Sequence, residues 1–134
     1  MNNVYANAII IGDNNIRGRA LFYKCYNGVM VEIEVTGLPN INMFNVFPIH
    51  IHDGIDCSNI YGHYNPTNKV HPYHSGDLPD LYSNNGYAYY KFYTEKFNIE
   101  ELNNKFIIIH EPNTKSSIEF GKKIACGNIN INYY

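Results

Sequence analysis

The sequence predicts an all-β fold, an eight-stranded Greek-key barrel or sandwich with two long functional loops. Three observations lead to this prediction. Aromatic residues make up 15% of the 134-residue chain, and Tyr alone occurs 13 times, which favours sheet over helix. Short apolar segments alternate with Gly-, Asn- and Pro-rich turns. About eight such segments are typical of sandwiches and barrels. The length fits a single domain spanning residues 1–134.

The N-terminal third shows the clearest strand pattern. Residues 4–11 and 17–26 are apolar segments separated by a turn-forming stretch. The pair Asn27-Gly28 predicts a tight hairpin turn before the next strand, residues 30–36. In that strand the apolar residues alternate with glutamates, as in a half-buried strand. The apolar set is Val31, Ile33 and Val35, and the polar set is Glu32 and Glu34.

The remainder of the chain places its long loops beside further strands. Loops of such length inside one domain are usually functional. The expected elements are a strand at 44–52, a loop at 53–85, a strand at 86–97, one helical turn at 98–104 with Asn98 as its cap, a strand at 105–110, a loop at 111–122 and a final strand at 124–131.

Charge and apolar content argue against several classes of protein. The formal net charge is −2 without a run of like charges, which argues against a nucleic-acid surface. Every apolar run is far shorter than the roughly 18 residues of a membrane span. The first residues carry no secretion-signal pattern, so a cytoplasmic location is expected.

The three cysteines allow one disulfide and one free thiol without fixing which residues pair. Cys25 lies in a predicted strand, where a buried small apolar residue is expected.

All six histidines fall between residues 50 and 110. Neutral imidazole is a good ligand for copper and zinc, so this clustering suggests a metal site. His50 and His52 share one face of a predicted strand because side chains repeat with period two. By itself this pair is equally compatible with two ordinary strand histidines.

A second candidate group lies in the first long loop. His71, His74 and Asp77 have the spacing H-x-x-H-x-x-D. Zinc prefers four ligands in a tetrahedron, and His63 is a candidate for the fourth. A solvated polar loop is the alternative for this segment. His110 ends an apolar strand, where a lone histidine is more often a core or edge residue than a ligand.

Taken together, these residues resemble the copper/zinc superoxide dismutase family. The resemblance extends over nearly the whole chain, and its motifs occur in the family's order. They are Ile49-His50-Ile51-His52, Gly62-His63-Tyr64-Asn65-Pro66, the segment from His71 to Pro79, Ile109-His110-Glu111 and Ala125-Cys126-Gly127. The resemblance implies superoxide as the small-molecule substrate, no nucleic-acid or membrane partner, and allows a homodimer.

The resemblance also implies a role for each matching residue. The copper ligands would be His50, His52, His63 and His110, and the zinc ligands would be His63, His71, His74 and Asp77. His63 would thus bridge the two metals and act catalytically by carrying a proton. Cys57 and Cys126 would form a disulfide. Lys123 falls where the family usually has an arginine beside the copper, and it would attract the substrate.

Two departures from the family pattern keep alternatives open. Lysine provides a positive charge but lacks the planar two-pronged contact of arginine. In addition, no aspartate occurs between His110 and Cys126, where the family has one that supports ligands of both metals; Glu111 or Glu119 is a candidate substitute. One alternative is therefore a weak or inactive metal-binding relative, such as a carrier or decoy. Another is a structural sandwich with a single zinc.

Overall fold

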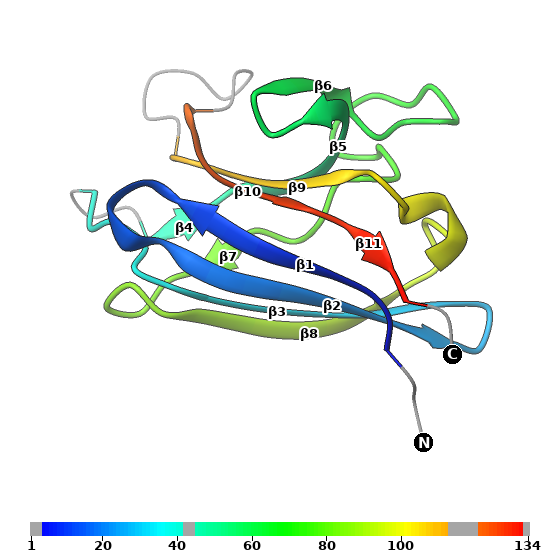
Figure 1. Ribbon diagram of the computed structural model, residues 1–134, viewed down its shortest axis with the longest axis horizontal. Coiled ribbons are helices and arrows are strands. Elements are labelled where there is room, and N and C mark those ends of the chain that lie inside the picture. Colours follow the sequence, from blue (N-terminus) through cyan, green and yellow to red (C-terminus); the bar gives the residue numbers. More distant parts are fainter. Residues whose placement is uncertain (1–3, 42–44, 113–120, 133–134) are drawn as a thin grey trace.

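The computed structural model describes residues 4–41, 45–112 and 121–132 (Figure 1). Nine strands form one sheet in the order β6-β5-β9-β10-β1-β2-β3-β8, with β11 pairing β1, and β4 pairs β7 in a separate ribbon. The strands are β1 (Val4–Gly12), β2 (Arg17–Cys25), β3 (Gly28–Thr36), β4 (Val46–Phe47), β5 (Ile49–Asp56), β6 (Asn59–His63), β7 (Leu81–Tyr82), β8 (Ala88–Thr94), β9 (Phe106–His110), β10 (Lys123–Asn128) and β11 (Asn130–Ile131).

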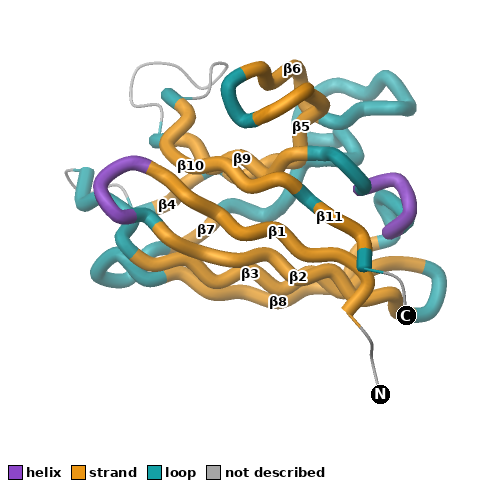
Figure 2. Tube along the Cα trace, in the orientation of Figure 1, coloured by secondary structure: helices purple, strands orange, loops and turns teal. Residues whose placement is uncertain are grey.

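The large sheet folds over so that its two halves face each other. Figures 1 and 2 show β1, β2, β3 and β8 on one side, and β5, β6, β9 and β10 on the other. Strand neighbours such as β3 and β8, or β5 and β9, are far apart in the sequence, as in Greek-key folds. The predicted all-β sandwich is confirmed, although the described residues form eleven strands rather than eight.

The hydrophobic core lies between the two halves of the sheet. Val31, Ile33 and Val35 are fully buried, as their alternation predicts, while the intervening glutamates are only partly covered. Ile51 from β5 and Ile109 from β9 belong to the same cluster on the opposite side. At about 25 cal/mol per Å² of apolar surface removed from water, this burial is the main force holding the halves together.

The first hairpin turn lies one residue earlier than predicted. Cys25 pairs with Gly28, so the turn residues are Tyr26 and Asn27. Gly28 already belongs to β3, and a Cβ there would lie 2.2 Å from the carbonyl oxygen of Thr94. The glycine is therefore required by the close approach of β8 rather than by the turn. Cys25 at this hairpin is only half-buried, so the expectation of a buried residue is wrong.

The expected loop at 53–85 contains more regular structure than its sequence suggests. β5 runs on to Asp56, and β6 and β7 both lie within this segment. The β5–β6 pairing contains two irregularities in register, and β6 is an edge strand that is largely exposed. An irregular, exposed edge hairpin needs no alternation of apolar residues, which is why the sequence pattern missed it.

Two other predicted strands are divided. The one at 44–52 separates at Pro48 into β4, which pairs with β7, and β5, which pairs with β9; Phe44 lies outside the described residues. The final strand separates at the buried Ile129 into β10 and β11. Most of the expected second loop, residues 113–120, also lies outside the described part.

The predicted helical turn at 98–104 is a short 3-10 helix, η2 (Ile99–Leu102). Asn98 occupies the N-cap position but makes no capping hydrogen bond through its side chain. The turn residues Asp13–Asn15 form a second 3-10 helix, η1. Within the described ranges, none of the helices has the length and apolar character needed to cross a membrane.

Candidate metal centre

Three histidines come from neighbouring strands of the same half-sheet. His50 and His52 lie on β5 and His110 ends β9, which pairs with β5. Ile51 and Ile109 point into the core, so the histidines face the opposite side of the sheet, where His50 and His52 are also buried. One ligand nitrogen from each of the three rings lies within 4.8 Å of the others. We call these three residues the strand group.

Backbone carbonyls fix the orientation of two of these rings. His52 Nδ1 lies 2.8 Å from the carbonyl oxygen of Tyr61, and His110 Nδ1 lies 3.0 Å from that of Gly121. A carbonyl only accepts hydrogen bonds, so each Nδ1 carries the proton and each Nε2 is the unprotonated nitrogen of its neutral ring. His52 Nε2 is buried and has no hydrogen-bond partner among the described residues. A buried bare nitrogen of this kind fits a metal ligand.

A second group of ligands surrounds the carboxylate of Asp77. His63 Nδ1 lies 2.9 Å from Asp77 Oδ1, and the Nδ1 atoms of His71 and His74 lie 3.2 and 3.3 Å from Oδ2. The backbone N–H of His74 also donates to Oδ2 at 2.9 Å. Asp77 is buried, whereas the His71 side chain is 43% exposed. These four residues, which we call the loop group, offer three nitrogens and one oxygen.

His63 is the residue that joins the two groups. Its Nδ1 faces the other residues of the loop group, at 3.0 Å from His74 Nδ1 and 2.9 Å from Asp77 Oδ1. Its ring stacks on His50 with centroids 4.0 Å apart and lies 4.7 Å from the ring of His52. Because Nδ1 is turned to the loop group, Nε2 is the nitrogen that remains for the strand group. The structure therefore brings together all seven ligand candidates.

Burial favours the neutral form of the four histidine rings around His63. Burial, followed by repulsion from His63 and His110, lowers the pKa of His50 to about 2. Burial likewise lowers the pKa of His63 to about 4 and is the main cause of the lowered pKa values of His52 and His110. Neutral imidazole is the form that binds metals, so protons compete weakly for these nitrogens near pH 7.

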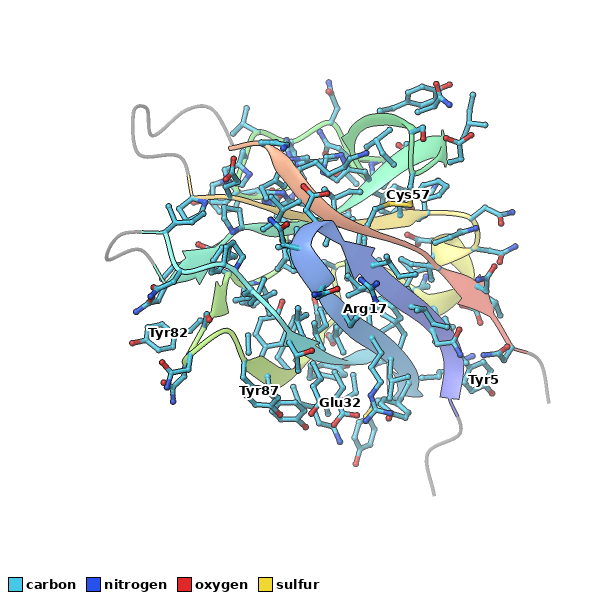
Figure 3. The ribbon with its side chains drawn as sticks, turned by 60° about the vertical axis from the view of Figure 1, so that its left-hand side comes forward. Tyr5, Arg17, Glu32, Cys57, Tyr82 and Tyr87 are labelled. Atoms are coloured by element: carbon cyan, nitrogen blue, oxygen red, sulfur yellow. A yellow bond between two sulfur atoms is a disulfide. The ribbon has the colours of Figure 1, made fainter. Side chains whose placement is uncertain are left out.

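The disulfide Cys57–Cys126 is present, with Cα atoms 6.0 Å apart. Cys57, labelled in Figure 3, lies in the turn between β5 and β6, and Cys126 lies on β10. The bond therefore ties the hairpin beside the strand group to the strand that pairs with β9. The third cysteine, Cys25, is free.

Lys123 lies at the edge of the strand group. It is the first residue of β10 and pairs with His110 in the strand register. The Lys123 side chain is exposed, and its ammonium group donates a hydrogen bond to the carbonyl oxygen of Cys57. Its positive charge contributes to the lowered pKa values of His52 and His110. Lys123, the one cation predicted to act at the site, therefore lies close to the strand group.

Sequence reasoning missed the groups that support the ligands. Tyr61 and Gly121 act through backbone carbonyls, which have no side-chain signature in a sequence. Lys96 is also part of the support, because its Nζ donates to the backbone carbonyl of Asp77 at 2.9 Å. Lys96 lies in the segment after β8, and its distance in sequence from the loop group left no signal that relates the two.

The fold and site geometry agree with what the comparisons show. Residues 16–129 match the family model of copper/zinc superoxide dismutase, a range that includes all seven ligand candidates, Lys123 and both disulfide cysteines. The chain belongs to this family. A relative named copper-zinc superoxide dismutase 3, from Arabidopsis thaliana, is 28% identical over 155 positions, covering 96% of this chain and 92% of the relative.

This member of the copper/zinc superoxide dismutase family is shorter than that relative over the aligned region. The alignment spans 155 positions and this chain has 134 residues, so at least 21 positions of the relative have no counterpart here.

Proposed function

We propose that this chain converts superoxide into oxygen and hydrogen peroxide at a copper ion and a zinc ion that share His63. The observation that carries the proposal is the position of His63, whose Nδ1 faces the loop group while its ring contacts His50 and His52. A single zinc site in a structural sandwich would need only the loop group. It would give no reason for three further histidines beside that group, two of which, His50 and His52, are buried.

The donor atoms fit the two metals differently. The strand group and His63 Nε2 would offer copper an all-nitrogen set, which suits a metal that changes oxidation state. His63 Nδ1, His71, His74 and Asp77 would offer zinc four ligands with one carboxylate, a set that zinc accepts in tetrahedral sites. The buried, bare His52 Nε2 supports this assignment because it has no other role among the described residues.

The overall reaction consumes two superoxide anions and two protons, and yields one O₂ and one H₂O₂. Bound copper would supply the one-electron redox chemistry. The chain would attract the anion through Lys123, whose ammonium group is exposed at the edge of the strand group. Whenever His63 Nε2 is not used as a metal ligand, it would hold one of the two protons and deliver it to the reduced oxygen species, while Asp77 and His74 keep the ring oriented through its Nδ1 side.

The direct test is dismutase activity after reconstitution with copper and zinc, with metal content measured on the same sample. We expect about one copper and one zinc per chain together with activity that depends on both metals. Zinc alone would support the single-zinc alternative. Full occupancy by both metals without activity would contradict the enzymatic proposal and support a metal carrier or decoy.

The role of Lys123 is tested by comparison with its neighbour. Lys123→Met removes the charge beside the strand group, and we expect the rate with superoxide to fall about tenfold at low ionic strength. Lys122→Met removes the same charge from an exposed residue whose Nζ lies 3.7 Å from Asp13 Oδ2, and should have much less effect. Equal losses in the two variants would contradict local guidance by Lys123.

A weak or inactive metal-binding relative is the second candidate. It is favoured by the lysine in place of the family's usual arginine and by the lack of an aspartate between His110 and Cys126. Lys123→Arg distinguishes the two candidates. A rise in activity would support the enzyme, whereas no activity in either form at full copper content would support the carrier or decoy.

A further inference from the structure

Three residues that are not themselves ligand candidates connect the segments that carry the candidates. Ile51 stands between the two β5 histidines, Tyr64 follows His63, and Gly76 precedes Asp77. Their backbones form a closed ring of hydrogen bonds, each 2.8 Å long: Ile51 N–H donates to Gly76, Gly76 N–H donates to Tyr64, and Tyr64 N–H donates to Ile51. We call this ring the backbone triangle.

The triangle is anchored in the hydrophobic core. Ile51 is fully buried, Gly76 is buried, and the partly buried Tyr64 packs against the main cluster. Leu78, two residues beyond Gly76, is also part of that cluster. Opening a buried backbone hydrogen bond leaves polar groups without water or protein partners, which is costly. The triangle therefore has sources of stability that do not depend on a metal.

The position of Gly76 has no room for a side chain, because the backbones of the three segments meet there. A Cβ at Gly76 would lie 2.4 Å from the carbonyl oxygen of Ile51 and 3.1 Å from Cβ of Tyr64. Real Cβ atoms do not approach a backbone oxygen to 2.4 Å, so any side chain here would push the three segments apart. Gly62, just before His63, provides a natural contrast, because a Cβ there meets nothing within 4 Å.

We propose that the backbone triangle fixes the loop group against the strand group before any metal binds, and that Gly76 is a positioning residue for the metal pair. This inference rests on the proposed two-metal function. His63 and Asp77 each adjoin a corner of the triangle, and the β5 histidines flank the third corner. Lys96 adds a further connection, the hydrogen bond from its Nζ to the backbone carbonyl of Asp77. Because the backbones are joined, a metal bound at one group alters metal binding at the other group through His63, and this coupling is reciprocal.

Hydrogen exchange on the metal-free wild-type protein tests whether the triangle exists without metal. The amides of Ile51, Tyr64 and Gly76 should exchange slowly. The amide of Asn68 is a reference from the same loop, because its bond to Asn65 is an exposed local turn. If the three amides exchange as fast as that of Asn68 and slow only after zinc is added, the proposal is overturned.

Substitution tests the consequence for the metals. Gly76→Ala should weaken zinc binding about 10- to 100-fold, the usual range for loss of support behind ligands. When the copper-loaded Gly76→Ala variant is brought to a saturating zinc concentration, its cupric EPR spectrum should no longer change. The matched control Gly62→Ala should keep both the zinc affinity and the spectral change.

The two variants and the wild-type protein separate the possible outcomes. Wild-type affinity together with the full spectral change in Gly76→Ala would overturn the proposal. Should that variant fail to fold, the exchange measurement on the wild-type chain decides. Wild-type protein that binds and couples both metals without dismutase activity would refute the proposed function while supporting the triangle.

Discussion

The strand group and the loop group reach the same centre by different structural means. His50, His52 and His110 are held by paired strands whose register also builds the core. His71 and His74 lie in a turn-rich segment and are oriented around the buried carboxylate of Asp77. The comparison teaches that paired strands can place ligand candidates through their register, whereas the loop adds a buried carboxylate around which its rings are arranged. His63 belongs to both systems, so substitutions can separate them.

The largest expected effect is that of His63→Ala. Because one ring serves both groups, we expect zinc affinity and copper affinity each to fall by at least about 100-fold, more than the usual loss for a supporting residue. The matched variant His52→Ala removes a ligand from the strand group only, so its zinc content should stay close to that of the wild-type protein. Metal analysis after reconstitution measures both. Normal copper and zinc in His63→Ala would refute the shared ligand.

The next effect concerns the disulfide that supports the strand side of the comparison. Cys57→Ser opens a bond that joins residues 69 positions apart, and the chain-entropy relation gives a loss of about 4 kcal/mol in the free energy of unfolding. Cys25→Ser, at the half-buried free thiol, should change it by only about 0.5 kcal/mol. Denaturant unfolding of the metal-free proteins gives both values. Similar losses in the two variants would show that the bond adds little constraint.

The last effect is a pH dependence in the metal-free protein. The folded pKa values of His50 and His63, about 2 and about 4, lie below the unfolded value of about 6.5. The unfolded chain therefore binds protons more readily, so the stability these rings contribute is present above pH 6.5 and is lost as the pH falls toward 4.

Melting temperatures measured between pH 7 and 4 check this dependence. They should fall more steeply for the wild-type protein than for His63→Gln, which lacks one of the titrating rings. Parallel curves for the two proteins would contradict the role of His63.

The sequence predicted strands best where one face is buried. The alternation of Val31, Ile33 and Val35 with glutamates matched β3, because a half-buried strand must repeat with period two. The same reasoning missed β6, whose edge position exposes most of its residues. It also placed Gly28 in the first turn, although this glycine is needed because β8 passes close to it. Exposure at the sheet edge explains the first error, and a contact with a strand distant in the sequence explains the second.

For the candidate site, the sequence by itself determined the types, spacing and order of the candidate ligands, because a metal requires particular donor atoms and each donor atom belongs to a residue type. The tertiary structure alone decided which nitrogen each ring presents, through carbonyls such as those of Tyr61 and Gly121. It also joined the segments that carry the two groups, through backbone hydrogen bonds such as that between Ile51 and Gly76. The physical reason is that backbone donors and acceptors are the same in every residue, so their partners are set only when distant segments pack together.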